Sequence, residues 1–142
     1  MGTHMSDVLG RINERLAREH LLRLNQKAQE GCPLVGLPAE VERFLRKGEF
    51  LRIRIMDPYS RPDRRGVDLH CRALIADSNE NLFVQVKSSW QEVVNFYHGG
   101  DMKYRYRGEV YPIFVIFPDD RKDYEYTLLG RSGIEKRLLE EE

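Results

Sequence analysis

The sequence predicts a mixed α/β (α+β) fold in which one sheet carries helices on its faces. Three observations predict it: apolar residues recur at helical spacing over residues 6–30, residues 50–55 alternate, and residues 67–75 and 82–87 are apolar segments separated by turn residues. We find no internal repeat or low-complexity linker, so a single sheet flanked by helices is the simplest architecture.

The helices and strands are expected in a definite order. The first helix covers residues 6–30 and stops at Gly31, and Pro38 opens a short second helix that ends at Gly48. Residues 50–55 alternate like a half-exposed strand. The remaining expected elements are a strand at 67–75, a turn at 77–81, a strand at 82–87, a helix capped by Ser88 or Ser89 and running to about Tyr97, a buried strand from Tyr111 to Phe117, and a terminal helix from Ser132.

Length and composition indicate one well-solvated domain. The 142 residues are 41% hydrophobic and 32% charged, and no apolar stretch is long enough to cross a membrane, so we expect an intracellular, cytoplasmic protein. Residues 1–5 resemble an expression-tag remnant, which leaves residues 6–142 as the expected domain. The cysteines, Cys32 and Cys71, are far apart and form no CxxC motif, which argues against a disulfide or a zinc site.

The formal net charge is zero, which argues against a protein that coats nucleic acid non-specifically. The charge is nevertheless unevenly distributed, with acid in the C-terminal residues 140–142 and cations in the middle of the chain. A local basic surface is therefore expected, and its candidate residues are Arg52, Arg54, Arg61, Arg64, Arg65, Arg72, Lys103, Arg105 and Arg107.

The clearest chemical signal is Asp68 together with Gln85 and Lys87 on the neighbouring strand. Side chains in a strand alternate between its faces, so Gln85 and Lys87 point the same way while Phe83, Val84 and Val86 provide apolar packing around them. The three polar side chains are expected to converge at a sheet edge, an arrangement suited to metal-assisted hydrolysis of a phosphodiester.

With these residues and this element order, the chain resembles the PD-(D/E)XK nuclease superfamily, whose restriction-endonuclease-like core has the order α-β-β-β-α-β. The residues Gly66-Val67-Asp68-Leu69 and Gln85-Val86-Lys87 are similar to the "GxD…QxK" pattern of Mrr-type restriction endonucleases and, less closely, to Holliday-junction resolvases. The resemblance covers residues 38–118 and departs from the family name at Val67, which stands where proline is expected. Pro62-Asp63 spells the literal dipeptide in a loop, but Asp68 has the better strand context.

The resemblance implies a metal-dependent endonuclease that hydrolyses DNA in restriction, repair or junction resolution, with DNA favoured over RNA. It assigns Mg²⁺ or Mn²⁺ to Asp68, Gln85 and the Val86 carbonyl, and it makes Lys87 the catalytic lysine. The alternative is a catalytically inactive nuclease-fold module that binds nucleic acid or protein partners, because Gln85 stands where an acidic residue is usual.

Many relatives supply a further acid from a helix. Glu40 and Glu42 both border the apolar stripe of the second helix, so either can lean over the sheet edge. Of the two, we prefer Glu40 for this catalytic role. Glu14 and Glu19 are the alternatives if the first helix is the core one.

Residues near this motif are candidates for contact with a nucleic-acid backbone. Residues 103–107 interleave cations with aromatic rings, as in surfaces that stack bases, although a solvent-facing strand or hairpin explains the alternation equally well. Ser88 and Ser89 can contact a phosphate or cap a helix. A homodimer is a reasonable expectation, since two sites suit the cutting of two strands. The expected nucleic-acid-binding residues are Arg64, Arg65, Ser88, Ser89, Lys103 and Arg105.

Overall fold

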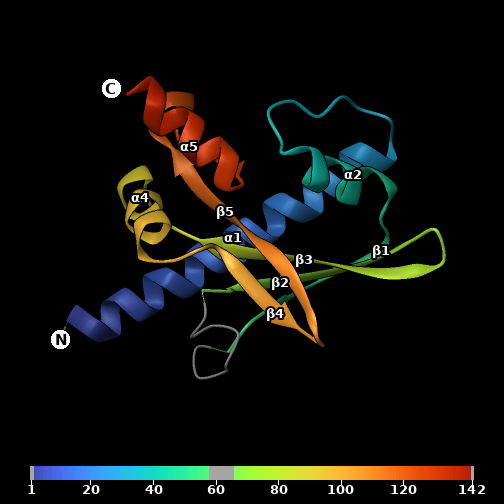
Figure 1. Cartoon of the computed structure of the whole chain (residues 1–142), viewed down its shortest axis with the longest axis horizontal. Helices are drawn as coiled ribbons and strands as arrows, with labels where there is room; N and C mark the ends of the chain where they lie inside the picture. Colours follow the sequence, from blue (N-terminus) through green and yellow to red (C-terminus); the bar gives the residue numbers. More distant parts are fainter. Residues whose placement is uncertain (1, 58–65, 142) are drawn as a thin grey trace.

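A mixed sheet of six strands forms the centre of the computed structural model, which describes residues 2–57 and 66–141 (Figure 1). The predicted fold class is confirmed, because the described residues form a sheet with helices packed on it in the expected order. The elements are α1 (Gly2–Gln29), α2 (Ala39–Lys47), β1 (Glu49–Ile55), β2 (Leu69–Ile75), β3 (Ser78–Val86), α4 (Trp90–Gly99), β4 (Lys103–Tyr106), β5 (Glu109–Asp119), a 3-10 turn (Asp120–Lys122), β6 (Glu125–Leu129) and α5 (Arg131–Glu140).

The strands lie in the order β1-β2-β3-β5-β4, and β6 also pairs with β5. All neighbours are antiparallel except β3 and β5, which run parallel with Phe83 opposite Ile113. A parallel pair needs a crossover connection, and here α4 and β4 supply it. β5 therefore joins two halves of the sheet, with β3 along one edge and β4 followed by β6 along the other.

Two tight turns explain where the strands differ from the expected ones. Ala76 and Asp77 both have positive φ (48° and 64°), the backbone of a mirror-image hairpin turn, so β3 begins at Ser78 inside the expected turn. Arg107 and Gly108 repeat this conformation (φ 50° and 83°) and join β4 to β5. β4 is the strand of a hairpin, the alternative that the sequence analysis gave for residues 103–107, whereas β6 is a strand that it did not predict.

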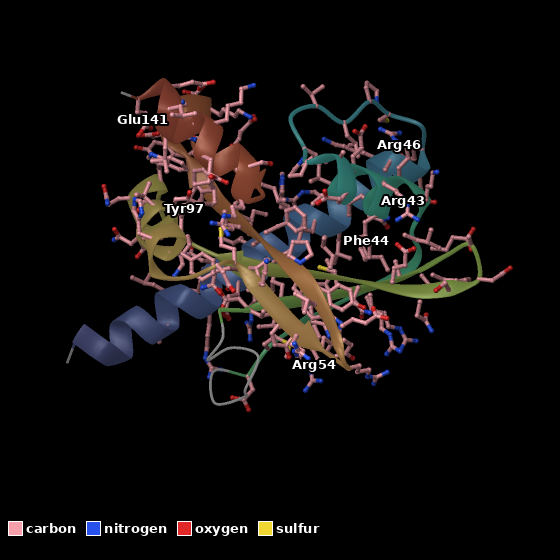
Figure 2. The ribbon with its side chains drawn as sticks, in the orientation of Figure 1. Arg43, Phe44, Arg46, Arg54, Tyr97 and Glu141 are labelled. Carbon is pink, nitrogen blue, oxygen red and sulfur yellow. The ribbon has the colours of Figure 1, made fainter. Side chains whose placement is uncertain are left out.

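Alternation along the strands divides the core into two layers. One layer lies under α1 and α2, where Leu21 and Phe44 pack against Val84 and its neighbours. In Figure 2, Phe44 points from α2 toward the sheet, whereas Arg43 and Arg46 lie on the outer side of the helix. The second layer lies under α4 and α5, where Val93 and Ile134 are fully buried.

A buried ion pair fastens α5 to the sheet. Arg137 Nη1 donates to Asp119 Oδ2 over 2.8 Å, and the Thr127 hydroxyl donates to the same oxygen over 2.9 Å. The Arg137 guanidinium also lies over the Trp90 ring, 4.1 Å from its centroid. Burial tends to raise the pKa of Asp119, but these hydrogen bonds and the Arg137 charge outweigh it, so the pKa lies below the ordinary value.

Candidate active site

A cleft with a volume of about 470 Å³ opens where α1, the end of β3 and the start of α4 meet. Asp68, Gln85 and Lys87 all line this cleft, as do Glu14 of α1 and Glu92 of α4. The three residues singled out from the sequence therefore come together, and Glu14 joins them from a distant part of the chain.

Asp68 is held against β3 by its backbone and by its side chain. Its N–H donates to the Val84 carbonyl over 2.9 Å, and its own carbonyl accepts from the Met56 N–H over 2.8 Å. The Val86 N–H donates to Asp68 Oδ2 over 2.8 Å, and the residue is only 7% exposed. These contacts fix the carboxylate beside Gln85, although Asp68 itself precedes the first ladder residue of β2, Leu69.

Gln85 carries an unsatisfied polar atom. The residue is 9% exposed, and its side-chain oxygen Oε1 has no hydrogen-bond partner among the described residues. A buried polar atom without a partner costs about 1–3 kcal/mol. This cost is removed if the oxygen contacts a ligand, a water molecule or a cation.

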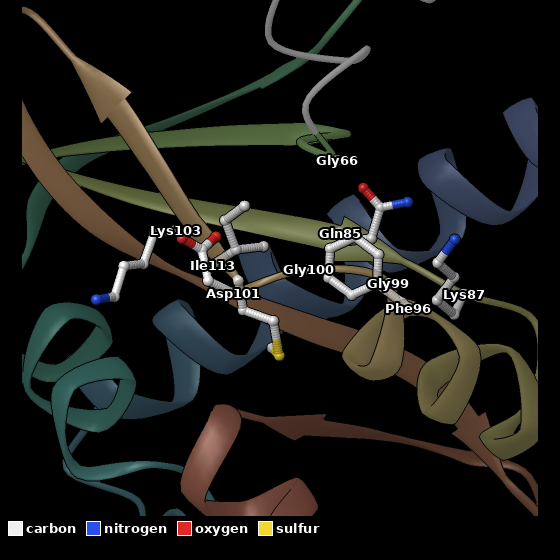
Figure 3. Close-up of a pocket in the computed structure, with 10 residues that line it drawn as sticks. Gly66, Gln85, Lys87, Phe96, Gly99, Gly100, Asp101, Lys103 and Ile113 are labelled. Atoms are coloured by element: carbon white, nitrogen blue, oxygen red, sulfur yellow. The ribbon is translucent and has the colours of Figure 1, made fainter.

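Lys87 follows β3 directly and shares a face with Gln85. Its N–H donates to the Ile116 carbonyl of β5 over 2.9 Å, and its Nζ lies 5.2 Å from the centroid of the Phe96 ring. Figure 3 shows Gln85, Lys87 and Phe96 together at a second pocket of about 420 Å³, which adjoins the cleft. The lysine therefore stands at the boundary between the two cavities.

Helix α1 contributes Glu14 to the cleft, whereas Glu40 of α2 is not among the residues that line it. Val41 and Phe44 turn the apolar side of α2 onto the sheet, which leaves Glu40 exposed. In addition, Arg43 bonds Glu80 over 2.9 Å, so α2 is anchored near the β2–β3 turn, at the opposite end of these strands from Asp68. Our preference for Glu40 is therefore not supported by its position.

The packing of α1 places Glu14 at the cleft. Ala17 and Leu21 are fully buried, and Gly10, Asn13 and Glu14 continue the same side of α1 one and two turns earlier, at the cleft. The first helix is thus the one that covers the end of β3 carrying Gln85.

Ser88 and Ser89 cap α4. The Ser89 hydroxyl oxygen accepts from the Glu92 N–H over 3.3 Å, while the Ser88 N–H donates to the Glu92 carboxylate over 2.8 Å. Hydrogen bonds from the Ser88 hydroxyl and N–H lower the pKa of Glu92. The Glu92 carboxylate already occupies this helix N-terminus, so a phosphate approaching the two serines would meet a negative charge.

The other candidate contacts with nucleic acid are dispersed. Arg64 and Arg65 lie outside the described residues, as does Asp63. Lys103 and Arg105 are exposed on β4, where they alternate with Tyr104 and Tyr106.

His70 belongs to a different environment from Asp68, although the two lie two residues apart. Its ring stacks on Phe83 with centroids 4.7 Å apart, and its Nε2 lies 2.8 Å from Asn81 Oδ1. Burial lowers the pKa of His70, and the charges of Arg72, Arg54 and Arg107 lower it further, while the Asn81 hydrogen bond opposes them.

The cleft contains oxygen atoms of the kind that hard divalent cations prefer as ligands. Two of the three cleft carboxylates, Glu14 and Asp68, and the unsatisfied amide oxygen of Gln85 are oxygen donors of the kind that Mg²⁺ and Mn²⁺ prefer, while the third carboxylate, Glu92, accepts from Ser88. Within residues 2–57 and 66–141, no cluster of three or more His, Cys, Asp or Glu side chains could hold a metal ion. A metal ion at the cleft would therefore need the amide oxygen of Gln85 as a ligand in addition to the carboxylates.

No protein-family model, curated protein or solved structure matches the chain. The PD-(D/E)XK resemblance thus stays a prediction from the quoted residues. Among the described residues, no helix is both long enough and apolar enough to cross a membrane.

Proposed function

We propose that this chain is a metal-dependent nuclease that hydrolyses phosphodiester bonds in DNA. The observation that carries the proposal is the cleft in which Glu14, Asp68, Gln85 and Lys87 meet, with a buried amide oxygen left without a partner. Carboxylate and amide oxygens together with a lysine suit a reaction that develops negative charge on phosphate oxygens.

The residues divide the work by their chemistry. Asp68, Gln85 and the carbonyl of Val86 would hold Mg²⁺ or Mn²⁺, with Glu14 as the additional acid. The ion, when bound, supplies Lewis-acid polarisation of the phosphodiester and lowers the pKa of a nearby water. Lys87 stabilises the charge that develops on the phosphate and orients the attacking water, and the Phe96 ring of the adjoining pocket contacts its ammonium group.

The test compares cleavage of labelled single-stranded, duplex and branched DNA with Mg²⁺, with Mn²⁺ and with a chelator. Asp68→Ala and Lys87→Ala are each expected to lower the rate by about 10²–10³, as losses of single charge-stabilising groups do. Glu14→Gln should be impaired, while Glu40→Gln, an exposed acid away from the cleft, is the matched control and should cut normally.

Thermal unfolding gives a second readout that needs no activity. A cation that binds only the folded chain raises its stability by mass action, so Mg²⁺ or Mn²⁺ should raise the Tm of the wild type but not of Asp68→Ala. Intact DNA with every folded variant and no shift with either ion would overturn the proposal and favour the inactive binding module.

A further inference from the structure

Five aromatic rings gather on one face of the sheet, away from the candidate active site. They are called the aromatic cluster here, and each ring lies on a strand whose register brings it to this face. His70 lies 5.0 Å from Tyr106, and the buried Phe83 ring contacts the tyrosines at 4.8–5.3 Å between centroids. The cluster consists of His70, Phe83, Tyr104, Tyr106 and Tyr111.

A hollow of about 530 Å³ opens beside these rings. Tyr106 and Tyr111 form its aromatic wall, both half-buried, and the remaining walls are mostly polar. The Arg107 guanidinium lies over the Tyr106 ring, 5.2 Å from its centroid. The hollow therefore offers rings and a planar cation to a flat ligand.

Exposed arginines surround the cluster. Arg54 pairs with His70 in the strand register and Arg52 with Arg72, so these cations share the face of the rings. Figure 2 shows Arg54 on the side of the sheet opposite α2. The ion pairs among the described residues include none of the four arginines here, Arg52, Arg54, Arg72 and Arg107.

The acids at the hollow are already engaged. Glu80 binds Arg43 through two bonds of 2.9 and 3.2 Å, and Glu109 accepts from the Tyr111 hydroxyl over 2.9 Å. Glu80 is thus paired with Arg43, whereas Glu109 keeps its negative charge beside a neutral hydroxyl. The four arginines outnumber the acids at the hollow, which makes this face complementary to a polyanion.

The hollow and the cleft lie along the same strand. Asn81, Phe83 and Gln85 alternate onto one face of β3, with Asn81 at the hollow and Gln85 at the cleft. Four residues of strand separate these two ends by about 13 Å. One extended ligand can contact both.

We propose that the aromatic cluster and its arginines bind a single-stranded segment of nucleic acid, with a base in the hollow beside Tyr106 and Tyr111 and phosphates on Arg72 and Arg54. The inference rests on the proposed function for its choice of nucleic acid over another polyanion. An unpaired base exposes the flat surface that an aromatic ring can stack on, whereas a duplex hides it. The rings therefore favour a single strand or a frayed end leading to the cleft.

Binding is measured by fluorescence anisotropy with a labelled 12-nucleotide single strand and its matched duplex, in the Lys87→Ala background with a chelator present. Tyr106→Leu should weaken single-strand binding about ten-fold or more, because it removes a stacking ring. Tyr106→Phe keeps the ring and should bind like the parent. Arg72→Gln should lower the slope of log K against log salt by about 0.7, the effect of one phosphate contact to a single strand.

The exposed Arg131 of α5 supplies the matched cation control, and Arg131→Gln should leave binding unchanged. Failure of the single strand to bind, unchanged affinity in Tyr106→Leu, or equal affinity for the duplex would each overturn the inference. Because cleavage is absent from this assay, a negative result leaves the nuclease proposal standing, and a failed cleavage test leaves this binding result interpretable.

Discussion

Gly66 is the position at which one added methyl group should disturb the candidate active site most directly. Its φ is +90°, a conformation that residues with a Cβ rarely adopt. A Cβ built there would lie 2.7 and 2.9 Å from Cε1 and Cζ of the Phe96 ring, and 3.7 Å from Gln85 Oε1. Gly66→Ala would therefore strain the backbone and displace the ring beside Lys87.

The expected destabilisation has two parts. Placing a Cβ at positive φ costs about 1–2 kcal/mol, and overpacking against the ring costs about 1–3 kcal/mol. The total is about 2–5 kcal/mol. With an unfolding entropy of about 2.1 cal/mol/K per residue over the chain, this corresponds to a Tm lowered by roughly 7–17 °C.

The assay is thermal and denaturant unfolding of a double-mutant cycle with Phe96→Leu. In that background the ring clash is relieved, so Gly66→Ala should cost only the backbone part, about 1–2 kcal/mol. Gly10→Ala is the control: it lies in α1 with no heavy atom within 4 Å of the added Cβ and should stabilise by about 0.5–1 kcal/mol. A Tm of Gly66→Ala close to that of the wild type, or an equal cost in both backgrounds, would refute the reasoning.

Three further predictions concern groups outside the cleft. Burial, with the charges of two neighbouring cations, lowers the pKa of His20. The free energy of unfolding should therefore be highest above about pH 6.5 and fall as the pH drops below it. In urea unfolding, His20→Gln should show a weaker fall. Arg137→Met leaves the Asp119 carboxylate without its ion-pair partner and should lower the free energy of unfolding in denaturant by about 3–5 kcal/mol. Adding Asp119→Asn should recover part of this stability. Burial raises the pKa of Cys71 to about 12. A thiol reagent at pH 8 should therefore label Cys32 in the native protein and Cys71 only after unfolding. Rapid labelling of Cys71 in the native protein would contradict this.

The part of the site that lies on one hairpin could be predicted from sequence. Alternation fixed the faces of the strands, and the short connection made them neighbours, so Asp68 and Gln85 had to lie close together. Val86 adds a backbone hydrogen bond to the Asp68 carboxylate, a contact that no residue pattern records because every residue except proline offers the same N–H.

The acid from the helix could not be chosen in the same way. Glu14 and Glu40 both border apolar stripes, and local periodicity is alike for the two helices. The choice depends on which helix covers the end of β3 that carries Gln85, and this is set by the packing of Leu21 and Ala17 on the sheet. Sequence spacing describes one helix face at a time and does not order the helices over a sheet.

For another reason, the strand β4 was only an alternative in the sequence analysis and β6 was missed. Each is short, at four and five residues, and each is stabilised by pairing with the distant or neighbouring residues of β5. The turn at Arg107-Gly108 was a usable signal for the first of them, since a glycine at positive φ favours a hairpin.

The parallel pairing of β3 with β5 also sets the order in which the site can assemble during folding. The β2–β3 hairpin is local and can form within about 1–10 μs, which brings Asp68 beside Gln85. Lys87 is fixed only when its N–H meets Ile116 of β5, after the chain has completed the α4 crossover, and Glu14 arrives only when α1 docks. Contacts between distant parts of a chain form more slowly, so recovery of the complete cleft should lag behind recovery of the hairpin, and refolding experiments can use the cleft as a reporter of the last step.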